Sequence, residues 1–365
     1  MKRFRRWMSG IAGTAGAQSL TVVGFGCMTV FALPAHAQDA AEAPAEPPSA
    51  ECQAFAADPD ADVGDIIRAG CKPTVGQMSA LMDNPLGNVA MLFTQVDTYV
   101  KKEPISGRED TQVNYMGIAQ FPKKLTKNWN LINRVIWNVG SLPLDLDSNS
   151  GYGSVPPGEV TPPPEDLPPG VTPPLPIDLF RGRTTGFGDM MYVGLFSPSG
   201  TKKVGKGNFT WGAGFDIGLP TASDDILGSG KWTAGPSALA VYMGPKWKVG
   251  GLVTHFKDFA SADSGRADVN LTNLQYFLFR SLNETTAIGM APNIICNWEQ
   301  SSDNKCTVPI GIGFVTTANI GKVPWRFGAE VHYSIVTPDD SLGTKWDFRF
   351  YAIPAAPSAL FGWMN

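Results

Sequence analysis

Apolar and polar residues alternate along many short stretches of this chain, and one stretch shows the pattern most clearly. From Val323 to Ile335 every second residue is apolar or aromatic, whereas Arg326, Glu330 and His332 lie among the residues between them. Side chains point to alternate faces of a β-strand, so one face would be apolar and the other polar and charged. A long series of such strands is typical of a barrel with lipid outside and a wet lumen.

The pattern predicts an all-β fold, a closed antiparallel transmembrane β-barrel of about 12 strands. Short connections tend to alternate with long ones, as in barrels with short periplasmic turns and long outer loops. Charged residues make up only 17% of the 365 residues. The chain nevertheless has no internal run of about 18 apolar residues, so we do not expect a membrane-spanning helix. The expected strands are 89–100, 111–121, 128–140, 185–197, 208–219, 231–243, 246–256, 269–281, 285–299, 305–317, 323–337 and 345–354.

Residues 1–37 have the features of a cleavable signal peptide. A basic start is followed by a small-apolar segment, Ile11 to Leu33, and by Ala35-His36-Ala37, an A-x-A cleavage pattern. We therefore expect export to the outer membrane of a Gram-negative bacterium. Removal of the four basic residues of this segment leaves 25 basic and 33 acidic residues, a net charge of −8. This acidic balance argues against nucleic acid as a partner.

Four cysteines remain after cleavage, and their even number in an oxidising compartment predicts two disulfides. Pairing of near neighbours in the chain gives Cys52 with Cys71 and Cys296 with Cys306. The second pair flanks a tight turn, where the two residues of a hairpin would lie almost opposite each other.

The rest of the chain divides by composition. We expect a disordered linker at 38–50, a helical, disulfide-clamped periplasmic segment at 51–88, the barrel at 89–354 and a tail at 355–365. The outer loop 141–184 contains a proline-rich stretch, 155–176, expected to be extended and exposed.

The helical segment before the first strand has two interpretations, a cap on the barrel or a plug in the lumen. Its helical spacing appears in Val63, Ile66, Ile67, Met78, Leu81 and Met82. As a plug, it would pair acidic residues with cations of the lumen. The acidic candidates are Asp58, Asp60, Asp62 and Asp65, and the basic ones are Arg134, Arg326 and Arg349.

Several segments together carry a resemblance to a known family. They are Asn128 to Arg134, Gly228 to Pro236, Trp247 to Val253, Ala291 to Asn293, Asn297 to Glu299, Thr307 to Gly311 and Thr337 to Asp339. Over about residues 85–354 the chain resembles the outer-membrane barrels named for the meta-pathway of phenol degradation, also labelled "neuromedin U", which are related to barrels that export functional-amyloid subunits. The resemblance implies a channel of about twelve strands. Cys306, in place of an aromatic residue, and the tail depart from the family pattern.

Charges on the polar faces of the strands are the candidates for lumen and selectivity residues. They are Arg134, Asp216, Arg326, Glu330, His332, Asp347 and Arg349. No pattern of metal ligands or of a cofactor-binding loop accompanies them, so we expect no metal and no cofactor.

One set of these residues has an enzymatic alternative. Glu330, His332 and Ser334 share one face of one strand, and outer-membrane lipases use a His-x-Ser pair. Lipases present that pair to lipid, whereas the lipid face of this strand carries Trp325 and Phe327. The alternation alone explains the polar triplet, so we expect no catalysis.

The sequence thus predicts a channel or transporter that passes small solutes, aromatic or hydrophobic ones included, or exports a polypeptide through a polar lumen. The partners expected are outer-membrane lipid, the transported solute or polypeptide and the barrel-assembly machinery. A lipid-modifying hydrolase and an adhesin barrel acting through its long loops are the alternatives.

Overall fold

The structure, a computed structural model, describes residues 49–58, 63–87, 89–102, 107–144, 180, 182–262, 265–321, 323–338 and 342–357. The predicted signal peptide, most of the predicted linker and the proline-rich stretch 155–176 lie outside the described residues.

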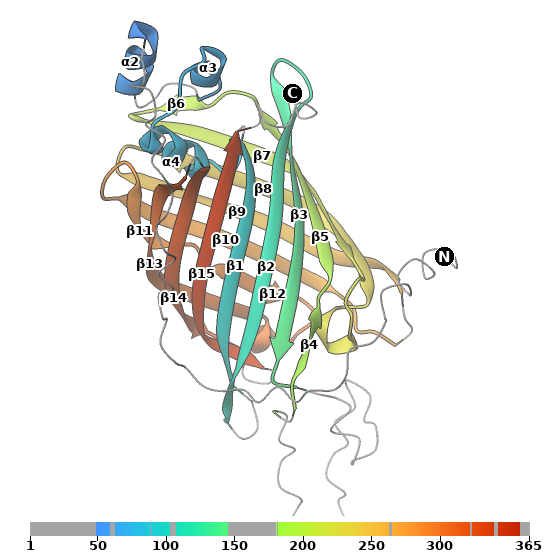
Figure 1. Ribbon diagram of the computed structural model, residues 1–365. Helices are drawn as coiled ribbons and strands as arrows, with labels where there is room; N and C mark the ends of the chain where they lie inside the picture. Colours follow the sequence, from blue (N-terminus) through green and yellow to red (C-terminus); the bar gives the residue numbers. More distant parts are fainter. Residues whose placement is uncertain are drawn as a thin grey trace, which may run out of the picture. The chain divides into compact units, whose positions relative to one another are not determined.

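The strands form one closed antiparallel barrel with twelve strand positions (Figure 1). Neighbours along the chain pair with each other, and pairing of β15 with β1 closes the ring. β4 and β5 together fill one strand position, and so do β11 and β12. The short β6 pairs with β7 as a hairpin in the β5–β7 connection. The strands are β1 (Val89–Lys102), β2 (Glu109–Lys124), β3 (Trp129–Leu142), β4 (Thr184–Phe187), β5 (Met190–Pro198), β6 (Lys202–Val204), β7 (Gly207–Leu219), β8 (Lys231–Met243), β9 (Trp247–Ser261), β10 (Asn270–Ser281), β11 (Thr286–Met290), β12 (Asn293–Asn297), β13 (Cys306–Ile320), β14 (Val323–Val336) and β15 (Gly343–Pro357).

The predicted fold class is confirmed, but three details of the predicted strands are wrong. The stretches 185–197 and 285–299 are each interrupted, at residues 188–189 and 291–292. Pro292 cannot donate to a strand ladder, which explains the second interruption. The last strand runs to Pro357 instead of ending at 354, because its end pairs with Val89 at the start of β1. The tail beyond residue 357 lies outside the described residues.

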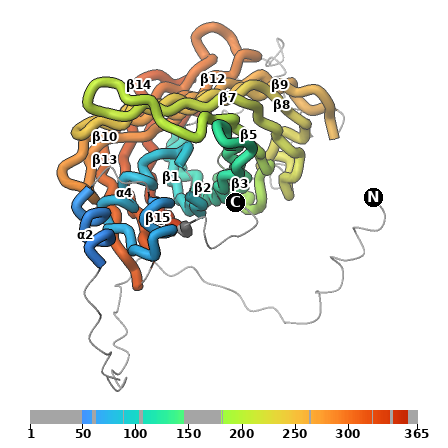
Figure 2. The backbone as a smooth tube through the Cα atoms, turned by 90° about the horizontal axis from the view of Figure 1, so that it is seen from above, coloured from blue at the N-terminus to red at the C-terminus, as the bar shows by residue number. Residues whose placement is uncertain are grey.

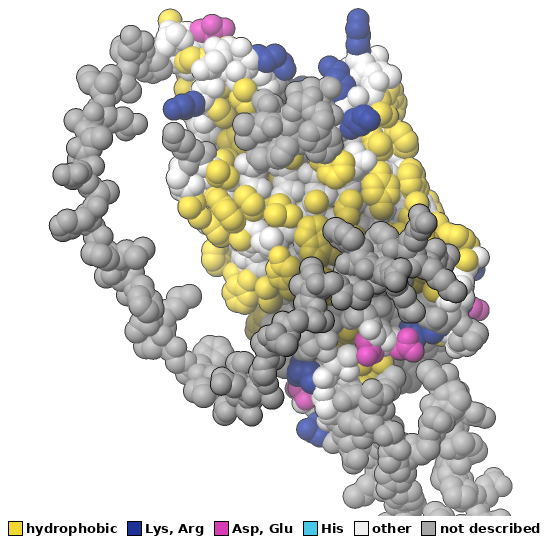
Figure 3. Space-filling model, turned by 45° about the vertical axis from the view of Figure 1, so that its right-hand side comes forward, with side chains coloured by type: hydrophobic (Ala, Val, Ile, Leu, Met, Phe, Trp, Pro, Cys, Tyr) yellow, Lys and Arg dark blue, Asp and Glu magenta, His cyan; other side chains and the backbone are white. Residues whose placement is uncertain are grey.

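The outer surface of the barrel carries a band of apolar side chains (Figure 3). Ile312, Phe314 and Phe350 are 63%, 51% and 59% exposed, whereas Val315 on the opposite face of β13 is 1% exposed. Charged side chains lie above and below this band in the same view. Such a band between polar ends is the surface that transmembrane barrels present to lipid.

The two ends of the barrel differ in their connections. Tight turns lie at one end, among them the β13–β14 turn, where Gly321 has a φ of +61° that favours glycine. The longer connections β3–β4, β7–β8, β9–β10 and β12–β13 lie at the other end. Three helices precede β1 at the short-turn end (Figure 1).

The helices are α2 (Ala50–Ala57), α3 (Val63–Arg68) and α4 (Val75–Asp83). The Cys52–Cys71 disulfide joins α2 to the connection between α3 and α4. Thr74 and Gln77 form a capping box at the start of α4, and the Gln77 amide also donates to the Phe55 carbonyl at 2.7 Å. None of the helices in the described ranges is long and apolar enough to cross a membrane.

The second predicted disulfide is also confirmed. Cys296 on β12 and Cys306 on β13 are register partners, with Cα atoms 4.1 Å apart. The bond closes the β12–β13 hairpin at the end with the longer connections.

Candidate functional site

The seven charged residues predicted for the lumen are all buried, with exposed fractions of 8% or less. The structure brings four of them together on β14 and β15, namely Glu330, His332, Asp347 and Arg349. Arg326 lies nearer the helical end of β14, and Arg134 and Asp216 lie on β3 and β7. The interior therefore has a clustered charged region and separate charged positions.

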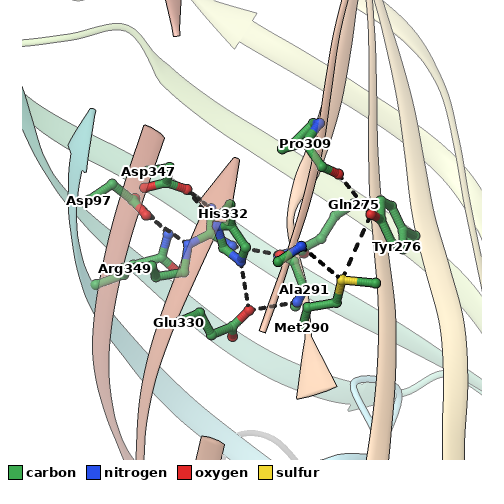
Figure 4. A network of polar contacts seen from close by, with 12 residues as sticks. Asp97, Gln275, Tyr276, Met290, Ala291, Pro309, Glu330, His332, Asp347 and Arg349 are labelled. Carbon is green, nitrogen blue, oxygen red and sulfur yellow. Dashed lines mark hydrogen bonds and ion pairs between the residues drawn. The ribbon is translucent and has the colours of Figure 1, made fainter. Parts of the chain in front are cut away.

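The clustered region is an ion-pair network that crosses three strands (Figure 4). Arg349 donates from Nε to Asp97 Oδ1 on β1 at 2.7 Å, and its Nη2 lies 3.5 Å from Asp347 Oδ2. His332 places Nδ1 2.9 Å from Asp347 and Nε2 2.9 Å from Glu330. Carboxylate oxygens accept hydrogen bonds and donate none, so a His332 imidazolium that donates from both ring nitrogens satisfies this arrangement.

The interruption between β11 and β12 is tied to the same network. The Ala291 amide donates to Glu330 Oε2 at 2.6 Å, and Arg349 Nη1 donates to the Ala291 carbonyl at 2.6 Å. Because β11–β12 and β15 are not neighbours in the barrel, these contacts hold the strand break on the inner side (Figure 4). On β10, Tyr276 donates to the Pro309 carbonyl of β13 at 2.8 Å and so links the strands on either side of the break.

A cavity of about 330 Å³ adjoins the network toward the end with the longer connections. Polar residues such as Lys101, Asn114 and Asn138 line it together with Asp347 and Arg349. Ile226 and Leu227 of the short 3₁₀ helix η1 (Asp225–Leu227) in the β7–β8 connection also line it. This connection thus narrows the entrance.

The β7–β8 connection is fastened by two side chains. Asp189 accepts from the backbone amides of Thr221, Ala222 and Ser229, at 3.0, 3.1 and 2.7 Å. Arg266 donates to the carbonyl of Asp225 at 2.6 Å and to that of Ser229 at 3.1 Å. These bonds give the entrance a defined shape.

At the other end, α4 contacts residues of the barrel interior. Asp83 forms ion pairs with Lys248 on β9 and Arg326 on β14, and its side chain is 3% exposed. Ser79 and Thr317 of β13 lie 3.1 Å apart through their hydroxyl oxygens. Seen from above, α4 lies within the ring of strands, whereas α2 lies outside it (Figure 2). One carboxylate therefore joins the helix to two separated walls.

One side of the interior is apolar, which departs from the polar lumen that the sequence predicts. A buried apolar cluster is formed by residues of β2, β3, β5, β8 and β9. It also includes Leu86, which lies between α4 and β1. The cluster consists of Leu86, Ile118, Ile132, Ile136, Val193, Leu195, Leu239, Val241 and Leu252. Alternation alone cannot reveal it, because these residues occupy positions that it assigns to the polar face.

Three residues that form ion pairs in the interior, Asp97, Asp83 and Lys248, are not among the residues predicted from the sequence. Asp97 shares its strand face with Gln95, Tyr99 and Lys101, so the alternation in β1 could have identified it. Asp83 and Lys248 carry no such signal as a pair, because their contact depends on where α4 lies. Arg326 pairs with Asp83 and not with one of the expected acidic residues, and Asp65 pairs with Arg68 of its own helix. Asp60 and Asp62 lie outside the described residues.

The geometry of the Glu330, His332 and Ser334 triplet differs from that of a hydrolase. Both ring nitrogens of His332 face carboxylates, so neither is placed to accept a proton from Ser334. Ser334 is 7% exposed and is the register partner of Pro309 inside the barrel. Within the described residues, no group of three or more His, Cys, Asp or Glu side chains could hold a metal ion.

The comparisons with known proteins find similarity in structure only. No family model and no curated protein matches the chain, so the family resemblance stays a prediction. An outer membrane channel from Pseudomonas putida F1 is similar over 73% of this chain and 94% of its own, with 13% identity and a TM-score of 0.46. The outer membrane phospholipase A of Escherichia coli is similar over 77% and 98%, with 12% identity and a TM-score of 0.38. At this distance the similarities assign no function.

Proposed function

We propose that this protein is an outer-membrane channel for small solutes, and that α4 with the residues after it closes the periplasmic mouth. The observation that carries the proposal is Asp83, which pairs with Lys248 and Arg326 from two walls of the interior. A membrane location is supported by the closed barrel, which leaves no strand edge in lipid, and by its apolar outer band.

A conducting role is supported by the interior, which is not filled uniformly by apolar side chains. The cavity of about 330 Å³ is lined by amides, hydroxyls and charges together with apolar residues such as Leu142 and Leu227, and the ion-pair network forms its inner boundary. Fixed charges of both signs in a pore select solutes by charge and size. The doubly engaged ring of His332 disfavours the hydrolase alternative.

Small solutes are favoured over an exported polypeptide by the contents of the barrel. The break at Ala291 and the network around Arg349 lie across part of the interior, and the β7–β8 connection narrows the entrance. A polypeptide would have to displace all three, whereas a small solute needs only local movement. The adhesin alternative depends on loop residues that lie mostly outside the described ranges.

Closure by α4 is supported by charge and by packing. Asp83 offsets the charge of the buried Arg326 and the partly buried Lys248, so removal of the helix would leave both without an ion pair. Leu86 packs in the apolar cluster of the interior, and Met78 and Met82 pack against Val89 and Met91 at the base of β1. Opening therefore requires movement of a segment with few residues but several specific contacts.

The test is the ionic current through the full mature protein and its Asp83→Asn variant in planar bilayers. The variant leaves Lys248 and Arg326 without a counter-charge, so we expect a conductance several-fold above wild type. Asp65→Asn is the matched control, because Asp65 is exposed and forms an ion pair with Arg68, one turn further along the same helix. Equal conductance in wild type and Asp83→Asn, with both barrels folded, would refute closure by α4.

A further inference from the structure

Arg134 is a buried cation in apolar surroundings. It lies on β3 between Ile132 and Ile136 on the same inner face and is 7% exposed. Its guanidinium lies over the Phe93 ring, 6.0 Å from the centroid. A cation–π contact of this kind offsets only part of the cost of removing a guanidinium from water.

Several other cations of the interior have carboxylate partners. Arg326 and Lys248 share Asp83, Arg349 pairs with Asp97, and Lys231 pairs with Asp258 at 2.8 Å. Arg134 is different: within the described ranges it forms no ion pair, and its Nε has no hydrogen-bond partner.

Its register partner on β2 is unsatisfied as well. Gln120 is 2% exposed, lies opposite Arg134, and neither its amide nitrogen nor its amide oxygen has a partner among the described residues. Asp216 lies beyond Val193 on the other side, two strands from Arg134. Its Oδ2 accepts from Ser237 at 2.6 Å, while Oδ1 has no partner among the described residues.

A buried guanidinium beside a buried amide that donates to nothing is costly unless an anion satisfies both. We infer that Arg134 and Gln120 form an internal subsite for the carboxylate of an amphipathic organic anion. The planar guanidinium matches a carboxylate in a two-pronged hydrogen bond, and the Gln120 amide supplies a further donor. Ile118, Ile136 and Phe93 would pack against the apolar body of the same solute. The inference rests on the proposed channel function, which brings solutes into the barrel.

The cavity supplies an approach to this subsite. Lys101 lines its outer part, where Nζ donates to Thr344 at 2.7 Å and, among the described residues, has no carboxylate partner. Arg349 lines the cavity deeper, and Arg134 follows beyond Ile136 on β3. Because Asp97 and Asp347 already neutralise Arg349, Arg134 is, among the described residues, the next cation without a carboxylate partner that an anion meets after Lys101.

Leu86 connects the subsite with closure. It packs in the same cluster as Ile118, Ile132 and Ile136. An apolar body bound beside Arg134 therefore competes with Leu86 for the same surface. We expect binding to become tighter when Leu86 is shortened to alanine, because room is made without touching a polar group.

The experiment is calorimetric titration of the full mature protein in detergent with benzoate, beside its neutral analogue benzamide. We expect benzoate to bind and benzamide to bind at least about tenfold more weakly, since only benzoate offers a charge to Arg134. Arg134→Met should weaken benzoate by about tenfold or more and Gln120→Leu by several-fold, while Leu86→Ala should tighten it. Lys101→Met, which lies outside the subsite, should change the equilibrium affinity by less than about twofold.

The outcomes separate this inference from the channel function. Benzoate affinity unchanged in Arg134→Met, or equal for benzoate and benzamide, would overturn the subsite even if the protein conducts in bilayers. Current absent from every form would overturn the channel, while the detergent titration would still decide on the subsite. If Arg134→Met does not fold, Arg134→Lys and Gln120→Leu decide, and full affinity in both overturns the subsite. The absence of benzoate binding would also overturn the subsite. If Asp216→Asn were then as destabilising as Arg134→Met, the role of Arg134 would be a water-mediated interaction with Asp216.

Discussion

At the scale of single residues, strand alternation identifies which side chains face the interior but not which of them meet. It assigned Glu330, His332, Asp347 and Arg349 to the polar faces, and the structure joins them in one network. Their partners Asp97 and Ala291 could not be paired with them from the sequence. Those contacts depend on the closure of the barrel between β15 and β1 and on the strand break.

Loss of one network carboxylate should be costly. Asp97→Asn leaves Arg349 with its bond to the Ala291 carbonyl and, for an ion pair, only the longer contact to Asp347. We therefore expect a loss of about 3 kcal/mol of stability, seen as easier unfolding in detergent. Glu109→Gln is the control, because its partner Lys345 is exposed and the pair contributes little. Equal unfolding of both variants would show that the network is not a stabilising element.

The triplet on β14 gives a second prediction at this scale. We expect no lipase or deacylase activity from the purified protein, and no activity lost in Ser334→Ala, because both nitrogens of His332 already face carboxylates. Hydrolysis of a phospholipid by wild type that disappears in Ser334→Ala would reverse the assignment.

At the scale of elements, the positions of strands were predictable and their interruptions were not. β8 begins and ends where the alternation predicts, since its inner and outer faces differ along its whole length. The break at residues 291–292 is visible in the sequence only as one proline. The backbone at this break is held toward the barrel interior by hydrogen bonds of Ala291 with Glu330 and Arg349, two residues that come later in the chain. The position of α4 likewise follows from tertiary contacts that no local pattern encodes.

A pair of cysteines can lock α4 in place. Ser79 and Thr317 lie 3.1 Å apart through their hydroxyls, so Ser79→Cys with Thr317→Cys should form a disulfide between the helix and β13. We expect the oxidised double variant to conduct no better than wild type and to lose any opening that wild type shows. Reduction should restore wild-type behaviour, with reduced wild type as the control for the two native disulfides. Full opening in the oxidised form would show that solutes pass without movement of α4.

At the scale of the whole molecule, the apolar outer band and the closed sheet predict a barrel that resists detergent. We expect unheated samples to migrate faster on gels than heated ones. A mature chain that stays dispersed in water without detergent would contradict the membrane assignment.

Closure of the channel by its own N-terminal segment can be measured by planar-bilayer recording of the mature protein and of a form lacking residues 38–84. The deletion removes Asp83 and α4 but leaves every strand. We expect low conductance for the mature protein and a several-fold higher conductance for the shortened form. Equal conductance in both folded forms would contradict it.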